Sequence, residues 1–234
     1  MAMSVHEHWF YPKIRHADAT VSNYTYPTSK VVCVGRNYLA HARELNNPVP
    51  QEPLLFIKPN SSLSDLTAGV NLPAIAAECH HEVEIAILIS RRATAIEARE
   101  AKDYIAGVGL ALDLTLREVQ ERLKKQGQPW EKAKAFDGSC PVTEFISLSE
   151  EADLANLNFH LAINDKMVQQ ANSSEMIFPV DMLLSDISRH FTLYPGDIVL
   201  TGTPSGVGPL NRHDELSLAL NSTQWRSVVD AADE

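Results

Sequence analysis

The sequence of 234 residues has few of the features of secreted or membrane-spanning proteins. It contains only three cysteines, Cys33, Cys79 and Cys140, an odd and widely spaced set that argues against a disulfide framework. No apolar run approaches the roughly 18 residues that a transmembrane helix needs. Residues 1–14 lack the basic and apolar segments of a signal peptide. We therefore expect a cytoplasmic protein with no membrane partner.

The 20 lysines and arginines are fewer than the 30 aspartates and glutamates. The formal net charge is -10, which disfavours a nucleic-acid partner and requires any site for an anionic ligand to be locally positive. The sequence has no repeat and no low-complexity segment. Hydrophobic residues make up 44% of the chain and charged residues 21%, which is typical of a folded globular domain.

Short apolar runs bounded by glycine, proline or asparagine dominate the chain and predict strands. We expect strands over residues 30–34, 54–58, 82–90, 107–114, 157–163, 166–170, 198–201, 216–220 and 225–229. Helical periodicity is confined to residues 37–45, 95–105, 116–126 and 179–191. Because strands and helices do not alternate regularly, we predict a β-rich α+β domain, rolled or sandwiched, rather than a doubly wound sheet. Residues 1–29 are a short N-terminal extension, and residues 30–234 form a single catalytic domain.

Three carboxylates in the strand regions form a candidate metal site. Glu82 and Glu84 are two residues apart in an otherwise apolar strand, so their side chains point to the same face. Burying two adjacent carboxylates requires a cation, and Asp113, at the end of another apolar run, supplies a third oxygen ligand. Carboxylate ligands suit Mg²⁺ or Mn²⁺ better than zinc. The alternative is that Glu82 and Glu84 lie on the wet face of an edge strand.

Other polar residues are candidates for catalysis and binding. His41 and Glu44 share one helix face, where the carboxylate would orient the imidazole as a general base, unless they are a simple surface pair. A basic and polar group comprises Lys58, Arg117, Gln120 and Lys134. Lys134, between apolar neighbours, would bind a substrate carboxylate or polarise a carbonyl, unless these side chains are simply solvated. The glycine-rich segment 201–208 is either an anion-binding loop or a structural turn. Segment 79–81 lacks the second ligand pair of a zinc finger, and Cys140 is a weak nucleophile candidate.

Taken in order, these segments resemble the fumarylacetoacetate hydrolase superfamily, and most of all its short acylpyruvate hydrolases. The resemblance extends from about residue 30 to the end. Any one segment is weak evidence for the family, but the whole set in this order is specific to it. The segments are residues 34–38 with His41 and Glu44, 80–84, 113–115 with Arg117 and Gln120, 134–137, 139–141, 176–178 and 196–204. Two departures are His213, where a glycine is common, and residues 1–29, which have no strong match.

The resemblance implies a mixed β-roll with few peripheral helices, usually assembled as a homodimer. It implies that Glu82, Glu84 and Asp113 hold Mg²⁺, with Mn²⁺ or Ca²⁺ as alternatives. It assigns catalysis to His41 and Glu44, on a helix that acts as a lid, and to Lys134 in the pocket. The residues expected to bind substrate are Arg36, Arg117, Gln120 and Thr203.

The resemblance implies a small 2-oxo acid as substrate. Our main prediction is hydrolysis of an acylpyruvate to pyruvate and a carboxylic acid, in which His41 activates water and the metal stabilises the enolate that leaves. The alternatives are an oxaloacetate decarboxylase, an oxaloacetate keto–enol tautomerase, and an isomerase or decarboxylase of 2-oxo acids from aromatic degradation. A non-catalytic metal-binding protein is a more remote alternative.

Overall fold

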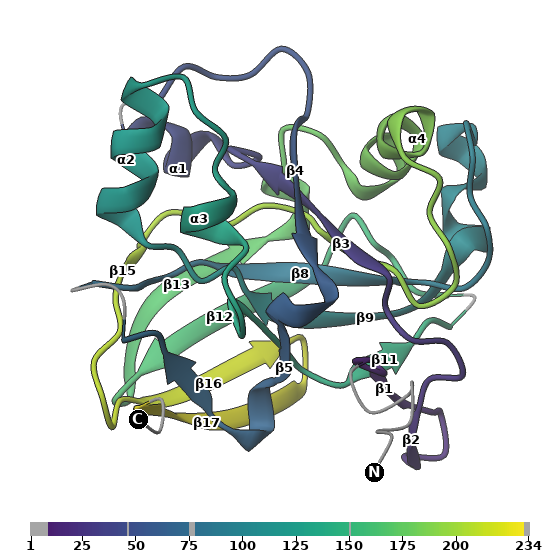
Figure 1. Ribbon diagram of the computed structural model, residues 1–234. Coiled ribbons are helices and arrows are strands. Elements are labelled where there is room, and N and C mark those ends of the chain that lie inside the picture. Colours follow the sequence, from purple (N-terminus) through teal and green to yellow (C-terminus); the bar gives the residue numbers. More distant parts are fainter. Residues whose placement is uncertain (1–8, 46, 75–77, 150, 232–234) are drawn as a thin grey trace, which may run out of the picture.

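The computed structural model describes residues 9–45, 47–74, 78–149 and 151–231, which build two mixed β-sheets with few helices (Figure 1). The large sheet has ten strands, eight of which follow one another in the order β2-β1-β11-β9-β8-β14-β3-β4. These are β2 (Val21–Asn23), β1 (Lys13–Arg15), β11 (Phe145–Ser147), β9 (Ile105–Leu112), β8 (Val83–Ile89), β14 (Ile198–Leu200), β3 (Lys30–Gly35) and β4 (Leu54–Pro59). The remaining pair is β5 (Leu63–Asp65) and β10 (Cys140–Val142), and β10 also pairs with β9.

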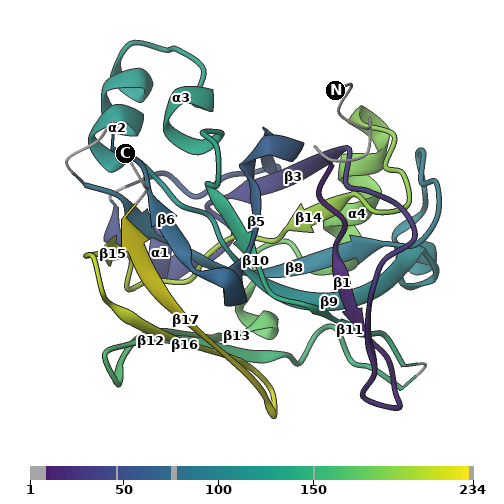
Figure 2. The same ribbon diagram turned by 60° about the horizontal axis from the view of Figure 1, so that its bottom comes forward.

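The second sheet packs against the large one through a shared apolar core (Figure 2). Its five strands are, in order, β13 (Lys166–Asn172), β12 (Asn158–Ile163), β16 (Glu215–Leu220), β17 (Thr223–Ala231) and β6 (Val70–Leu72). A short ladder joins β7 (His80–His81) to β15 (Gly208–Pro209). Ile85 of β8, Leu161 of β12 and Leu218 of β16 are fully buried in the shared core. The β-rich α+β architecture that we predicted is therefore confirmed.

Four α-helices and four 3₁₀ turns lie around the sheets. They are α1 (Leu39–Glu44), α2 (Arg117–Lys125), α3 (Glu131–Lys134), α4 (Val180–His190), η1 (Asn60–Ser62), η2 (Leu66–Ala68), η3 (Ala98–Tyr104) and η4 (Ser173–Glu175). Helices α2 and α3 lie side by side in both ribbon views, and α1 lies at the same end of the molecule (Figures 1 and 2). In the described chain, every helix is too short or too polar to cross a bilayer.

The prediction of an α-helix over residues 95–105 is wrong. It forms the 3₁₀ helix η3 over Ala98–Tyr104 instead. Ala95 has a positive φ of 49°, which breaks a regular helix before it starts. Within η3 only Ala101 is buried, and the two other buried residues of the predicted helix, Ile96 and Ile105, lie outside it, so η3 has no apolar stripe that would hold an α-helix against the core.

Positive φ angles mark two turns that the sequence signals. Asn164 and Asp165 have φ values of 50° and 61° and join β12 to β13, which confirms the predicted hairpin. His213 has a φ of 70°, a conformation that glycine adopts without strain. This explains why a glycine suits the position that His213 occupies.

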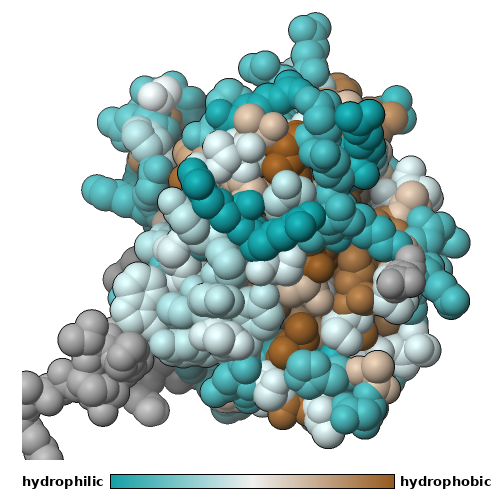
Figure 3. Space-filling view, turned by 90° about the vertical axis from the view of Figure 1, so that its right-hand side faces the viewer, coloured by the Kyte–Doolittle hydropathy of each residue, from teal (hydrophilic) through white to brown (hydrophobic). Residues whose placement is uncertain are grey.

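The N-terminal segment adds strands to the large sheet. Strand β1 pairs in parallel with β11, and β2 closes the sheet edge beside β1. Phe10 and Tyr24 pack against the second apolar cluster, on the opposite face of the large sheet from the shared core. On the face of the molecule seen in Figure 3, the hydrophobic residues of the described chain form separate groups divided by hydrophilic ones.

Candidate active site

The two glutamates of the candidate metal site lie at one end of strand β8. This strand lies between β9 and β14, in the interior of the large sheet, and every residue of Val83–Ile89 is buried, so it is not an edge strand and has no wet face. Its odd-numbered residues point into the core between the sheets, and its even-numbered residues point to the opposite face. Glu82 and Glu84 share that second face and are 4% and 2% exposed. The edge-strand alternative is therefore wrong.

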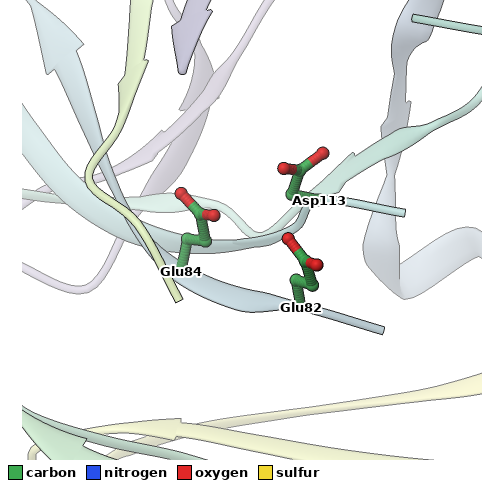
Figure 4. A group of neighbouring side chains, drawn as sticks. All are labelled: Glu82, Glu84 and Asp113. Carbon is green, nitrogen blue, oxygen red and sulfur yellow. The ribbon is translucent and has the colours of Figure 1, made fainter. Parts of the chain in front are cut away.

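Asp113 reaches the same point from the neighbouring strand. It follows the last residue of β9, which pairs antiparallel with β8, and its backbone N–H donates to Glu82 O at 2.8 Å. The three carboxylates face one another (Figure 4), and one oxygen from each lies within 4.8 Å of the others. All three residues are buried. The sequence prediction that these residues form one cluster is confirmed.

Lys134 and Arg117 balance part of this negative charge. Lys134 Nζ lies 2.7 Å from Glu82 Oε2 and 2.5 Å from Asp113 Oδ2, and Arg117 pairs with Glu82 Oε1. Burial alone would raise the pKa of Glu82, but Lys134 and Arg117 hold it well below its usual range. Burial would lower the pKa of Lys134, but Asp113 and Glu82 keep it above its usual value. Both cations are therefore part of the carboxylate cluster, and neither is free.

A second lysine, Lys58, lies beside Asp113 but directs its hydrogen bonds elsewhere. Its ammonium donates to Lys134 O, and at 3.1 Å to both Ser139 O and Ser139 Oγ, which accounts for its three N–H groups. It also forms an ion pair with Asp113 Oδ1 at 2.9 Å, but that buried oxygen accepts no hydrogen bond in the described chain. Since a buried acceptor is rarely left without a partner, Asp113 Oδ1 is suited to a ligand.

Glu84 is the carboxylate that most requires a cation. Its Oε2 accepts one hydrogen bond, from the Gly202 N–H at 2.7 Å, and no lysine or arginine in the described residues forms an ion pair with it. Burial, and then the neighbouring Asp113, raise its pKa well above its usual range. A divalent cation held by Glu84, Asp113 and Glu82 would remove this cost. The residues therefore fit a divalent metal.

The pair His41 and Glu44 lies beside the cluster on α1. His41 is 4% exposed, and its Nδ1 lies 3.4 Å from Glu44 Oε2. The Glu44 carboxylate also accepts from the Gly206 N–H at 3.0 and 3.2 Å, which ties α1 to the loop after β14. Glu44 thus faces Nδ1 of His41, and Nε2 is the ring nitrogen left for a substrate. The expected lid motion of α1 stays a prediction.

A buried glutamine that sequence reasoning missed positions the loop after β14. Gln169, on β13 of the second sheet, donates at 2.8 Å to Thr203 Oγ1 and at 2.9 Å to Pro204 O. Its Oε1 accepts from the Val83 N–H at 3.0 Å and lies 2.9 Å from His81 Nδ1. The Thr203 hydroxyl in turn donates to Val83 O at 2.8 Å. Gln169 therefore couples the loop to the start of β8, beside the carboxylate triad of Glu82, Glu84 and Asp113.

The predicted catalytic, metal-binding and substrate-binding residues, apart from Glu44, line one cavity that is open to solvent at its mouth. The predicted site residues that line it are Arg36, His41, Glu82, Glu84, Asp113, Arg117, Gln120, Lys134 and Thr203. The sequence prediction had missed Asn47, Phe56, Lys124 and Trp130. The position of Lys124, seven residues after Arg117 and four after Gln120, places it on the same face of α2 and is the signal that marks it. The aromatic rings of Phe56 and Trp130, 5.9 Å apart, form an apolar wall.

The cysteines take no part in this site as nucleophiles. All three are buried, and burial raises the pKa of Cys79 to about 11 and that of Cys140 to about 12. A thiol in such an environment is not ionised at neutral pH.

Comparison with known proteins agrees with the geometry. The fumarylacetoacetate (FAA) hydrolase C-terminal family matches residues 30–232, and the chain belongs to this family. Oxaloacetate tautomerase YcgM of Escherichia coli (strain K12) is 50% identical over 200 residues, which cover 84% of this chain and 90% of that protein. The mitochondrial oxaloacetate tautomerase FAHD1 of Bos taurus is 42% identical over 191 residues, which cover 82% of this chain and 86% of that protein.

A solved relative carries a different activity on the same fold. The crystal structure of fumarylpyruvate hydrolase from Pseudomonas aeruginosa, in complex with Mn²⁺ and pyruvate, is 30% identical and has a TM-score of 0.86. The match covers 94% of this chain and 97% of that one. The resemblance to the fumarylacetoacetate hydrolase superfamily is thus confirmed, and the family includes both tautomerases and hydrolases.

Proposed function

We propose that this protein interconverts the keto and enol forms of oxaloacetate with Mg²⁺ as its metal. The support comes from relatives at 50% and 42% identity that are oxaloacetate tautomerases, together with a cavity that joins a carboxylate triad to a histidine. This is one of the alternatives to acylpyruvate hydrolysis in our sequence prediction, and the relatives favour it over hydrolysis.

The chemistry needs one proton carrier and no co-reactant. In the keto-to-enol direction the C3–H bond breaks, a new O–H bond forms at the 2-oxo oxygen, and the same proton can make both moves. His41 Nε2 takes the proton from C3 and returns it to the oxygen, while Glu44 orients the ring through Nδ1. Mg²⁺, when held by Glu82, Glu84 and Asp113, supplies the Lewis acidity that favours negative charge on the 2-oxo oxygen.

The residues on α2 orient the substrate. Arg117 Nη1 donates to Gln120 Oε1 at 2.8 Å, so the amide nitrogen of Gln120 remains as a donor at the cavity wall. The rings of Phe56 and Trp130 add an apolar surface to the same cavity, which restricts water there. Restricting water favours proton transfer within the bound acid over exchange with solvent.

A direct assay tests the proposal. Enol oxaloacetate dissolved in an aprotic solvent is diluted into buffer, and the decay of its ultraviolet absorbance is followed with Mg²⁺ and with EDTA. We expect the protein with Mg²⁺ to accelerate the decay well beyond the buffer rate without releasing pyruvate. Decay at the buffer rate contradicts the proposal, and stoichiometric pyruvate release would identify a decarboxylase.

Acylpyruvate hydrolysis is the second candidate, favoured by the 30% identity to a fumarylpyruvate hydrolase. It is tested by pyruvate release from acetylpyruvate under the same conditions. Hydrolysis requires that His41 activate a water molecule, whereas tautomerisation requires only proton transfer within the substrate. Metal-dependent release of pyruvate and acetate, with enol decay at the buffer rate, would replace the proposal by this candidate.

The pH profile should report on His41. Burial lowers the pKa of its imidazole below the ordinary value of about 6.5. Because the neutral ring is the base, the acidic limb of kcat/KM for enol formation is expected to have its midpoint below pH 6.5. The His41→Ala variant should retain Mg²⁺ binding, lose about 100-fold or more in rate, and lack this limb. A limb that persists unchanged in His41→Ala would show that another group titrates.

A further inference from the structure

Two cations of the active-site cavity have no acidic partner. Four lysines and arginines line the cavity, and two of them, Arg117 and Lys134, are paired with Glu82. Arg36 and Lys124 form no ion pair with any carboxylate in the part of the chain that the structure describes. Half-buried cations that face a cavity without a counter-charge mark a place for an anion.

The surroundings hold these two cations at the cavity without neutralising them. Lys124 Nζ donates to Asn47 Oδ1 at 3.0 Å, and this neutral amide follows α1. Burial lowers the pKa of Lys124, and the nearby charges of Arg36 and Arg117 lower it further. Burial also lowers the pKa of Arg36. The charges of Glu121 and Glu82 offset only part of this lowering for Lys124.

The charge balance of the cavity indicates how many anionic groups it takes. The three carboxylates of Glu82, Glu84 and Asp113 carry the same total charge as the three basic residues that contact this cluster, Lys58, Arg117 and Lys134. A divalent metal adds two positive charges, and Arg36 and Lys124 add two more. The surplus is therefore about four positive charges. A 2-oxo acid with a single carboxylate would leave about three of them unbalanced, whereas a dicarboxylate would leave about two.

We propose that Arg36 and Lys124 form a subsite for the second carboxylate of a 2-oxo dicarboxylic acid. The inference rests on the proposed function in one respect, which is that the first carboxylate and the keto oxygen lie at the triad. It deepens that function, because it makes the two cations the residues that select oxaloacetate over pyruvate-like acids with one carboxylate. Lys124 has the larger role, since Asn47 and the face of α2 fix its position.

A binding experiment with two unreactive acids tests the subsite. L-malate and L-lactate are both 2-hydroxy acids and differ by one carboxylate. Their dissociation constants are measured by calorimetry on Mg²⁺-saturated protein, for the wild type and for Lys124→Met and Arg36→Gln. We expect the wild type to bind malate at least about tenfold more tightly than lactate, since hydrogen bonds to charged groups carry this much discrimination. In both variants the ratio of the lactate dissociation constant to the malate dissociation constant should fall toward one. The fall should come from weaker malate binding, while lactate binding is unchanged.

Lys125→Met is the matched control, because Lys125 is the next residue on α2 and is exposed outside the cavity. It should keep the wild-type ratio. A wild-type ratio near one, or a full ratio in both cavity variants, overturns the subsite. The measurement involves no turnover, so a wild type that discriminates malate but does not enolise oxaloacetate would refute the proposed function and keep the subsite. A wild type that enolises oxaloacetate without discriminating malate would do the reverse.

Discussion

Replacing Glu84 by alanine is expected to abolish binding of the divalent metal and to lower the tautomerase rate by more than about 100-fold. Loss of a residue that only supports a metal ligand typically costs 10–100-fold, so loss of a ligand itself should cost more. Glu84 is the triad member without an ion-pair partner in the described chain, which makes the metal its main source of compensation. Calorimetry with Mn²⁺ and the enol-decay assay measure the two effects.

The metal-free protein provides a second, independent measure of the same substitution. Burial of Glu84 without a cation is unfavourable, so its removal should leave the metal-free melting temperature unchanged or raise it. The wild type, by contrast, should melt at a higher temperature when Mn²⁺ is added, and the variant should show no such rise. Glu118→Gln, on the exposed side of α2, is the control. Wild-type Mn²⁺ affinity in Glu84→Ala would show that the triad is not the metal site.

The triad was predictable because strand geometry constrains it twice. Alternation along β8 places Glu82 and Glu84 on one face, and the antiparallel pairing of β8 with β9 brings Asp113 opposite. Both facts follow from short-range rules that a sequence displays directly. The sequence could not show whether β8 lies inside the sheet, because that depends on pairing with β14, more than 100 residues away.

The second sheet's contribution to the site was not predictable for a related reason. Gln169 lies on β13, and it reaches Thr203 and Val83 only because the two sheets pack together. A single glutamine in an alternating strand carries no signal of such a role. Lys124, by contrast, was available from its spacing along α2, since residues three, four and seven apart share a helix face.

The 3₁₀ segment η3 shows where local periodicity fails. Apolar residues at helical spacing predicted an α-helix over residues 95–105, but Ala95 has a positive φ and Ala101 is the one buried residue within η3 itself. Packing against α4 holds this segment in place instead. Element type was thus well predicted where many apolar residues share a face, and poorly predicted where few do.

Lys58→Met is expected to produce the largest loss of stability, about 3 kcal/mol or more in the free energy of unfolding. Removal of one partner from a buried ion pair typically costs about 3–5 kcal/mol. Lys58 is fully buried, and its ammonium satisfies the carbonyls of Lys134 and Ser139 beside the charge of Asp113. Methionine fills a similar volume, so the loss reflects charge and hydrogen bonding more than a cavity.

Urea unfolding in EDTA and again in saturating Mg²⁺ separates the two parts of this effect. A metal at the triad supplies positive charge near Asp113, so the gap between Lys58→Met and the wild type should narrow when Mg²⁺ is present. The carbonyls of Lys134 and Ser139 remain without their donor, and therefore part of the gap should persist. Lys125→Met, an exposed lysine, should change stability by less than about 0.5 kcal/mol. A Lys58→Met variant as stable as this control would show that the buried ammonium does not hold the carboxylate cluster together.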